Sequence, residues 1–547
     1  MRNLRSASAV DVASPAGAAS PAARAVPVAE GFAPYVWAPS TADIAARHGL
    51  RPEQVLRFDQ NTPPFAGVPQ LPLADSFATL NEYPDGTYRE LREAAAAFVG
   101  AGVTWEQVIV GAGADDLILL CARVFLAAGR RAHVAQRPTY SLYRIASELA
   151  GAPADAPLEE ADLVWCCNPN NPTGEAQPAA EVVALARSRP DVPVVVDEAY
   201  VEFGGESVVP RLRDAANLIA LRTLSKAFGF ASLRVGYAVA SPELAALLEA
   251  RRAPAPVAGP AARIAAAALR DPRLDVDAIA RERERMRAAL LAAGHDVPPT
   301  ATNFVAIRSE RDLAGALEAQ GLVVRPFAGG IRVTLRTPAE NDALLRALGA
   351  ETPPPASRTA AVQRTTTETA LRIVLDLDGA GRARVATGIG FLDHLLTLLG
   401  FHAGIDLEVV ACGDLDVDEH HLVEDVLASF GDALAQALGS RGGVARYGAA
   451  TVPMDEARAT AAVDLVRRPH AEIDLRFSGD RVGALAPSLL PHALERFAIQ
   501  AGCTVHVEAS GRDDHHVAEA AFKALGRALR EACARDGVGV RSTKGLA

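Results

Sequence analysis

Residues 418–425 read DEHHLVED and residues 513–523 read DDHHVAEAAFK, so the motif His-His-x-x-Glu occurs twice. Each copy opens a helical pattern, HHLVEDVLASFGDALAQALG in the first case and HHVAEAAFKALGRALREACA in the second. Strand-like segments precede each helix. Two copies of one unit predict a duplicated strand–helix domain of the α+β class rather than a solenoid, which needs more repeats.

The repeated histidines are candidate metal ligands. On a helix, residues four apart share one face and residues three apart nearly do, so both histidines of a pair can lie beside the glutamate. The two imidazoles of a pair point about 100° apart, so one helix would supply two metal sites rather than one. A single pair is more often a solvated helix start, but two identical spacings favour metal binding. The candidate ligands are His394, His420, His421, Glu424, His506, His515, His516 and Glu519.

These candidates comprise six imidazoles and two carboxylates, enough for two metals with three nitrogens and one oxygen each. His394 and His506 are expected in strand or turn positions. Imidazole and carboxylate without thiolate favour Mn, Fe or Zn over Ca or Mg.

The main domain boundary is predicted at ETPPPAS, residues 351–357, because a proline run removes amide donors and favours extended backbone. The first domain would span 31–350, with a large part at about 60–240 and a small part built from the N-terminal segment and about 250–350. The second would span 358–547. Residues 1–30 are rich in Ala, Ser and Pro and are expected to be a disordered tail.

Composition excludes several classes of protein. A formal net charge of −11 disfavours nucleic acid as the main partner. The sequence holds no run of 18 apolar residues, which disfavours a membrane span, and the start has no secretory apolar segment. Six cysteines without a C-x-x-C pair indicate reduced thiols. These features predict a cytoplasmic protein that acts on small molecules.

The first domain alternates strand and helix patterns, which is typical of an α/β domain with a parallel sheet. WEQVIVGAG, VPVVVDEAY and NLIALRTLSK read as strands, and ADDLILLCARVFLAAG reads as a helix. Three motifs occur along this domain in a fixed order, namely NPNNPTG at 168–174, VVVDEAY at 194–200 and TLSKAFGFASLRVGY at 223–237. An aldehyde cofactor needs a lysine, a pyridine nitrogen needs a carboxylate, and a phosphate needs hydroxyls, arginine and a helix start.

Residues 31–350 resemble the fold-type I, pyridoxal-phosphate-dependent aminotransferases, most closely histidinol-phosphate aminotransferase. The resemblance implies that Lys226 is the Schiff-base lysine, that Asp197 pairs with the pyridine nitrogen, and that Arg332 binds the carboxylate of the amino donor, glutamate. The remaining cofactor contacts that it implies are Asn171 and Tyr200 at the phenolic oxygen, Tyr140 on the ring, the amides of Ala114 and Asp115 with Thr223, Ser225 and Arg234 at the phosphate, and Tyr83 from the partner subunit of a dimer. The sequence departs from the family pattern at Ser232, Arg336 and FDQNTPP, residues 58–64.

Residues 358–547 resemble imidazoleglycerol-phosphate dehydratase through RTTTETALRIVLDLDG, TGIGFLDHLL, ARYGAATVPMDEA, RSTKGL and the two histidine motifs. The resemblance implies two manganese ions on the candidate ligands, an acid–base role for Glu368, and trimers that build larger assemblies. The phosphate ligands that it implies are Arg446, Arg468, Ser542 and Lys544, with Lys523 nearby. The chain departs from the family at VRRP, 466–469, and at Asp513.

Together the two resemblances imply consecutive steps of histidine biosynthesis in one chain. The dehydratase product, imidazole acetol phosphate, is the amino acceptor of histidinol-phosphate aminotransferase. Two alternatives concern the first domain, which would be either a threonine-phosphate decarboxylase or a non-catalytic scaffold for assembly.

Overall fold

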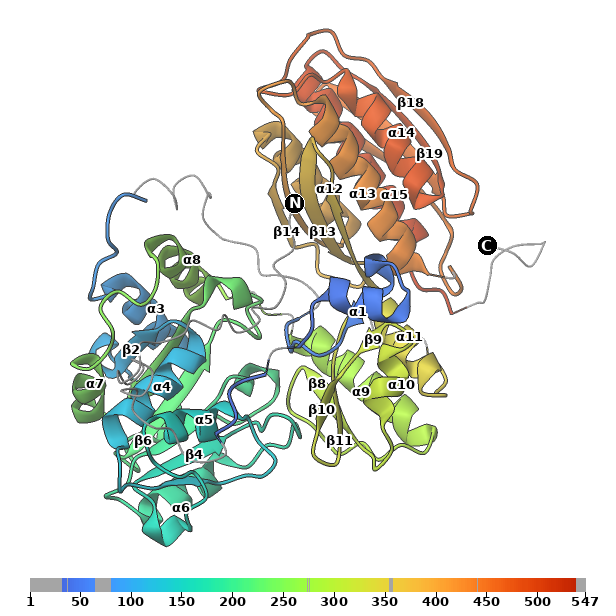
Figure 1. Cartoon of the computed structure of the whole chain (residues 1–547). Helices are drawn as coiled ribbons and strands as arrows, with labels where there is room; N and C mark the ends of the chain where they lie inside the picture. Colours follow the sequence, from blue (N-terminus) through green and yellow to red (C-terminus); the bar gives the residue numbers. More distant parts are fainter. Residues whose placement is uncertain are drawn as a thin grey trace, which may run out of the picture.

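The computed structural model describes residues 32–36, 38–63, 80–272, 274, 276–353, 358–439 and 441–537. The predicted tail at 1–30, residues 354–357 of the predicted linker, and Ser542 and Lys544 lie outside the described residues. Figure 1 shows an N-terminal region, up to residue 353, and a C-terminal region from residue 358. No helix of the described residues is long and apolar enough to cross a bilayer.

The N-terminal region contains a six-stranded sheet in the order β2-β7-β6-β5-β4-β3. Its strands are β2 (Val108–Gly111), β3 (Ala132–Val134), β4 (Leu163–Cys167), β5 (Val194–Asp197), β6 (Leu218–Thr223) and β7 (Gly236–Ala240). Strands β3 to β6 are parallel, as predicted. Strand β7 is antiparallel to both neighbours, because the β6–β7 connection holds only a three-residue 3₁₀-helix, η7 (Ala231–Leu233), and no crossover helix.

Helices cover both faces of this sheet (Figure 1). Alternate residues of each strand point to opposite faces, so Val194 and Val196 join one core and Val195 joins the other. The first core includes α3 (Arg89–Val99), α6 (Ala179–Ser188) and α8 (Gly259–Arg270), and the second includes α4 (Gly113–Phe125), α5 (Leu142–Leu149) and α7 (Pro242–Glu249).

The N-terminal region also contains a smaller unit, which is built from the beginning and the end of that region's sequence. Strand β1 (Leu56–Arg57) pairs in parallel with β9 (Leu322–Val323), and β8 (Phe304–Arg308), β10 (Arg325–Phe327) and β11 (Gly330–Thr334) form an antiparallel sheet in the order β10-β11-β8. The helices are α1 (Thr41–His48), α9 (Val276–Ala292), α10 (Leu313–Glu318) and α11 (Pro338–Ala347). Strand pairing between residues 56 and 322 therefore brings the N-terminal segment beside the end of this region.

The C-terminal region consists of two equivalent four-stranded sheets with helices between them (Figure 1). The first has the order β12-β13-β15-β14 and the second β16-β17-β19-β18, with the same parallel and antiparallel pairings. The strands are β12 (Thr359–Thr365), β13 (Thr369–Asp376), β14 (Ala383–Ala386), β15 (Asp406–Gly413), β16 (Tyr447–Met454), β17 (Ala457–Asp464), β18 (His470–Leu475) and β19 (Thr504–Ser510). The predicted duplication is confirmed.

Four helices fill the space between these sheets and share one hydrophobic core with them. They are α12 (Gly390–Ala403), α13 (His420–Leu438), α14 (Leu489–Ala501) and α15 (Asp514–Ala532). Helix α12 of the first half packs on α15 of the second, and α13 of the first half packs on α14 of the second. This exchange brings side chains from both halves together at the helix starts.

Candidate active sites

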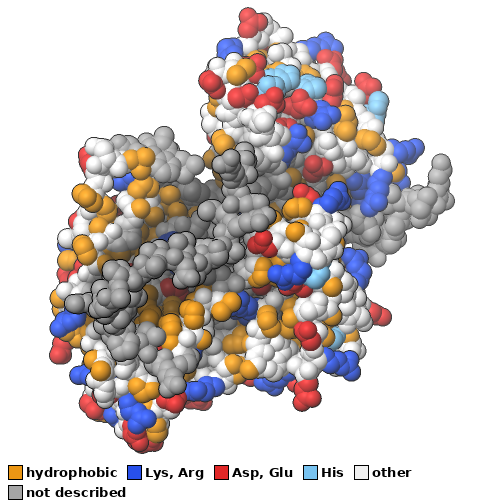
Figure 2. All heavy atoms as spheres, viewed as in Figure 1, with side chains coloured by type: hydrophobic (Ala, Val, Ile, Leu, Met, Phe, Trp, Pro, Cys, Tyr) orange, Lys and Arg blue, Asp and Glu red, His pale blue; other side chains and the backbone are white. Residues whose placement is uncertain are grey.

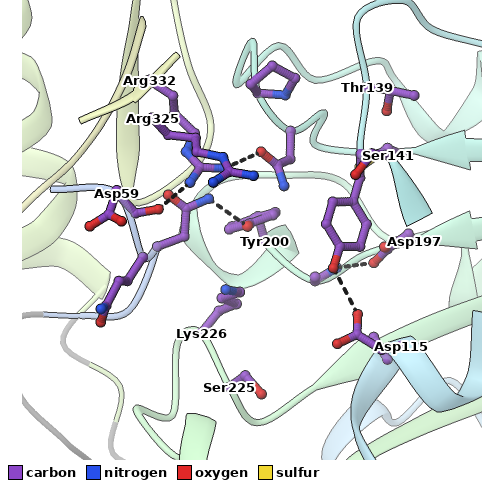
Figure 3. Close-up of a pocket in the computed structure, with 18 of the residues that line it drawn as sticks. Asp59, Asp115, Thr139, Ser141, Asp197, Tyr200, Ser225, Lys226, Arg325 and Arg332 are labelled. Carbon is purple, nitrogen blue, oxygen red and sulfur yellow. Dashed lines mark hydrogen bonds between the residues drawn. The ribbon is translucent and has the colours of Figure 1, made fainter. Parts of the chain in front are cut away.

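A cavity of about 500 Å³ lies in the N-terminal region. Three predicted residues enter it from consecutive strand ends, namely Asn171 after β4, Asp197 at the end of β5 and Lys226 after β6. Open α/β sheets bind ligands at the carboxyl ends of their strands. Figure 3 shows Lys226 between Arg332 on one side and Asp197 and Asp115 on the other. The three motifs, which are separate in the sequence, therefore contribute to one site.

Lys226 is half-buried, and its Nζ lies 5.7 Å from the centre of the Tyr200 ring. Burial, with the positive charge of Arg332, lowers the pKa of this amine to about 8. A lysine with a lowered pKa is neutral in a larger fraction of molecules near neutral pH, and the neutral amine is the nucleophile.

Asp197 is buried, and burial raises its pKa to about 6. Two hydrogen bonds favour its ionised form, one donated by the Tyr143 hydroxyl to Oδ2 at 2.6 Å and one by the Ala199 amide to Oδ1 at 3.1 Å. Tyr143 was not predicted. The sequence did offer an indication of its role. In RPTYSLY, Tyr143 comes three residues after Tyr140, which is about one helical turn, so the two side chains can lie on the same face.

The predicted phosphate ligands gather at the start of α4. Ala114, Asp115, Thr223, Ser225 and Arg234 all line the cavity. The carboxylate of Asp115 accepts hydrogen bonds from Arg234 Nη2 at 3.0 Å and from the Tyr140 hydroxyl at 3.1 Å, which fixes both side chains. A Cβ on Gly236 would lie 2.8 Å from the Ala114 amide nitrogen, so this close approach of backbones requires glycine.

Arg332 lies at the opposite end of the cavity and is buried. Its Nη1 donates to Asn171 Oδ1 and its Nη2 to the Asp59 carbonyl, both at 2.6 Å. Arg325 also lines this end. The unusual FDQNTPP segment contributes Asn61, which donates to the Tyr200 hydroxyl at 2.8 Å. Asn61 was missed because this segment departs from the family pattern.

Three remaining positions in this region lie outside the cavity lining. Tyr83 is 95% exposed, as a residue that acts on a partner subunit would be in a single chain. Ser232 is exposed in η7. Arg336 pairs with Glu340, with Nη2 and Oε1 2.9 Å apart. The departures at Ser232 and Arg336 therefore remove no residue from the cavity.

The described residues of the C-terminal region include two groups of possible metal ligands, each with ligand atoms within 4.8 Å of one another. The first group is His394, His515 and Glu519. Glu519 Oε1 lies 2.6 Å from His394 Nε2 and 3.0 Å from His515 Nε2. Burial raises the pKa of Glu519, but hydrogen bonds from His394, Lys523 and His515 outweigh it and hold this pKa at about 2.

The second group is His420, Glu424 and His492. Glu424 Oε2 lies 3.2 Å from His492 Nε2 and 3.6 Å from His420 Nε2. His492 was missed by the sequence analysis. Each group combines an i, i+4 pair from α13 or α15 with one histidine from the other half, His492 on α14 or His394 on α12. Figure 2 shows histidine and acidic side chains gathered on the surface of this region.

The other predicted ligands lie outside these groups. The rings of His420 and His421 are perpendicular, with centres 6.0 Å apart, and those of His515 and His516 are perpendicular, with centres 6.1 Å apart. His421 and His516 belong to neither group. His506 lies on the exposed side of β19 beside His470, with ring centres 6.1 Å apart. His506, which the sequence analysis placed with the other ligands, belongs to neither group among the described residues. The expectation that His394 lies in a strand or turn was wrong, because it lies in α12.

The predicted acid–base residue Glu368 is half-exposed, and its Oε2 lies 3.9 Å from His421 Nδ1. Lys523 Nζ donates a hydrogen bond to Glu519 Oε2. Arg446 pairs with Asp464 through Nε at 2.7 Å, and Arg468 is exposed.

The departure at Asp513 lies at the start of α15. Asp513 Oδ1 accepts a hydrogen bond from the His515 amide at 2.9 Å, and Asp418 Oδ1 accepts one from the His420 amide at 2.8 Å. Asp513 is the N-cap of α15, whereas Asp418 precedes Glu419, the N-cap of α13. The VRRP departure places Arg467 against the Gly439 carbonyl at 2.9 Å, away from both metal-ligand groups.

Two known protein families match different parts of the chain. The class I and II aminotransferase family matches residues 53–348, which is more than half of the chain, and the imidazoleglycerol-phosphate dehydratase family matches residues 387–529. The chain is 48% identical over 193 residues to the imidazoleglycerol-phosphate dehydratase of Magnetococcus marinus, covering 35% of this chain and 98% of that protein. The chain belongs to both families.

Two solved structures resemble the aminotransferase domain. YbdL of Escherichia coli, which has a methionine aminotransferase function, matches with a TM-score of 0.50 and 20% identity over 58% of this chain and 99% of that chain. This likeness shows the fold alone. Histidinol-phosphate aminotransferase of Sinorhizobium meliloti, solved with pyridoxal 5'-phosphate, matches with a TM-score of 0.49 and 26% identity over 57% of this chain and 94% of that chain.

The residues of the aminotransferase domain fit pyridoxal phosphate. The start of α4 offers two backbone amides, and the buried hydroxyls of Thr223 and Ser225 line the same end of the cavity. At the other end Arg332 Nε is buried without a hydrogen-bond partner among the described residues, which suits an anionic substrate group. The dehydratase domain fits a divalent metal, because each group of ligands combines imidazole and carboxylate.

The lowered pKa of Lys226 predicts how cofactor attachment depends on pH. The rate at which pyridoxal phosphate attaches to cofactor-free protein is expected to rise about tenfold per pH unit and to level off above about pH 8, where the amine is neutral. Stopped-flow absorbance measures the rate. A free alkylamine, whose pKa is about 10.4, provides the reference and should keep accelerating to pH 10. An enzyme rate that also keeps rising to pH 10 would contradict the lowered pKa.

Proposed function

We propose that this chain catalyses two consecutive reactions of histidine biosynthesis. The dehydratase domain converts imidazoleglycerol phosphate into imidazole acetol phosphate, and the aminotransferase domain converts that ketone and glutamate into histidinol phosphate and 2-oxoglutarate. The observation that carries the proposal is the presence in one chain of a dehydratase whose product is a ketone and an aminotransferase cavity that fits an anionic amino acceptor.

In the dehydratase domain, two manganese ions would bind the histidine–glutamate groups, with His421 and His516 as further ligands. Bound metal supplies a Lewis acid that favours the imidazolate form of the substrate ring. Glu368 takes a proton from the carbon next to the one that loses its hydroxyl, and the resulting enol becomes the ketone. The position of Glu368 beside His421 supports this role. Arg446, Arg468, Lys523, Ser542 and Lys544 would bind the substrate phosphate.

In the aminotransferase domain, pyridoxal phosphate supplies an electron sink when bound. Lys226 holds the cofactor covalently and moves the proton at the reacting carbon of the substrate. Asp197 holds the pyridine nitrogen through its carboxylate, which Tyr143 and the Ala199 amide orient. Arg332 binds the carboxylate of glutamate, and its two hydrogen bonds fix the guanidinium in the direction of the cavity.

The proposed assembly combines two interfaces. Tyr83 would reach the cofactor phosphate of a partner subunit across an aminotransferase dimer, and its 95% exposure in the single chain supports this. The dehydratase domains would form trimers in which subunits share metals. Among the described residues, His421 and His516 belong to neither ligand group of their own chain, which supports sharing.

The experiment that tests the function supplies imidazoleglycerol phosphate and glutamate to the full chain loaded with manganese and pyridoxal phosphate. Histidinol phosphate and 2-oxoglutarate are expected in equal amounts. Without glutamate the reaction should stop at the ketone. Accumulation of the ketone in the presence of glutamate would overturn the assignment of the aminotransferase domain, and release of carbon dioxide from threonine phosphate would favour the decarboxylase alternative.

A further inference from the structure

The duplication of the dehydratase domain gives Glu368 a counterpart. Glu368 directly precedes β13 in the β12–β13 hairpin, and Glu456 directly precedes β17 in the β16–β17 hairpin. Because the two sheets have the same order and pairings, these glutamates occupy equivalent positions. Each faces the second histidine of a His-His-x-x-Glu motif, His421 in the first half and His516 in the second. The proposed function uses Glu368 and leaves Glu456 without a role.

The two glutamates differ in how they meet these histidines. Glu456 Oε2 lies 2.9 Å from His516 Nδ1, which is a hydrogen bond, whereas Glu368 Oε2 lies 3.9 Å from His421 Nδ1. On His421 it is Asp414 that makes this contact, with its Oδ2 3.1 Å from Nδ1. Glu456 is also tied to the backbone through hydrogen bonds donated by the Arg512 and Asp513 amides. Its side chain is 19% exposed, against 50% for Glu368.

The strand register explains this difference. Thr369, the residue after Glu368, pairs with Gly413, and Asp414 follows. In the second half Arg458 pairs with Ser510, so Ala457 stands opposite Gly511 and the counterpart of Asp414 is Arg512. An arginine offers no carboxylate to the imidazole. The second half therefore depends on its hairpin glutamate for a bond that Asp414 makes in the first half.

We propose that Glu456 and Asp414 are positioning residues that orient His516 and His421 and fix the tautomer of each ring. A carboxylate that accepts the Nδ1 proton leaves the Nε2 lone pair free for a metal. The same arrangement explains why only one hairpin glutamate serves the reaction, because Asp414 relieves Glu368 of the orienting task and leaves its carboxylate open to substrate. This inference rests on the proposed metal-dependent dehydratase function.

The test replaces Glu456 by glutamine in the full chain and measures Mn²⁺ binding by calorimetry. Glutamine keeps the shape and an oxygen for the backbone amides, but it can present an N–H to Nδ1 and so favour the tautomer whose Nε2 carries the proton. Loss of an orienting carboxylate typically weakens metal binding by about 10- to 100-fold, and this loss is expected for Glu456→Gln and for Asp414→Asn. The visible spectrum of Co²⁺ bound at the same sites should also change.

Two controls separate positioning from other effects. Glu508→Gln removes an exposed carboxylate on the outer side of the same sheet and should leave the Mn²⁺ affinity unchanged. Glu368→Gln should stop dehydration yet keep the Mn²⁺ affinity within about twofold of wild type, since Asp414 still orients His421. Wild-type affinity in Glu456→Gln would overturn the proposal. If Glu456→Gln does not fold, Asp414→Asn decides it by the same criterion. A wild-type chain that binds no Mn²⁺ would instead overturn the proposed function.

Discussion

Replacing Lys226 by alanine is expected to lower the aminotransferase rate by at least about 10³-fold while dehydration continues at the wild-type rate. The lysine is the proposed covalent attachment point and proton carrier in the first cavity, and the metal-ligand groups belong to a separate region. The measurement is the rate of each reaction on its own substrate, with the cofactor absorbance recorded for the same samples. Folded protein should show no visible absorbance from lysine-bound cofactor.

The small number of lysines in the chain makes the site of cofactor attachment easy to identify. It contains three lysines, Lys226, Lys523 and Lys544, and Lys226 alone lies in the aminotransferase domain. Borohydride reduction followed by peptide mapping should therefore label one peptide of that domain. Lys523→Ala is the matched control, because it should impair dehydration and leave cofactor attachment intact. A Lys226→Ala protein that still transaminates, or that folds and fails to dehydrate, would contradict the assignment of the lysine or the separation of the two sites.

The sequence was sufficient for the elements that carry the chemistry. The predicted strands VPVVVDEAY and NLIALRTLSK carry Asp197 and Lys226 near their ends, and parallel strands bring such ends to one edge of the sheet. The His-His-x-x-Glu repeats predict two helices, and both start at these motifs. These features are local, since a helix period or a strand pattern depends on neighbouring residues.

The features that the sequence analysis missed depend on packing between distant segments. No local pattern shows that α12 packs on α15 and α13 on α14, yet this exchange assigns His394 and His492 to their groups. The duplication did hold a signal for His492, because HAL in LLPHAL repeats the place of HLL in FLDHLL. Reading the repeat only at the glutamate motifs led to His506 instead. Asn61 and Tyr143 were missed for a similar reason, since their roles arise from contacts with Tyr200 and Asp197.

His492 therefore provides the sharpest test of the metal sites. His492→Ala is expected to remove one of the two bound manganese ions per chain and to lower the dehydration rate by at least about 100-fold, because a direct ligand matters at least as much as its supporting residues. His506→Ala is the matched control, since both histidines are exposed and lie in the second half. It should leave metal content and rate unchanged.

Metal content per chain, measured by mass spectrometry of the purified protein, is compared with the two reaction rates. A chelator should reproduce the effect of His492→Ala on dehydration and spare the aminotransferase, whose cavity needs no metal. Because imidazole ligands must be neutral, metal loading should fall below about pH 6.5 in the wild type. The opposite result would be that His506→Ala loses metal and His492→Ala retains two ions. The ligand set predicted from the sequence, which includes His506, would then hold. The group of His420, Glu424 and His492 would be wrong, because helix packing alone placed His492 beside Glu424.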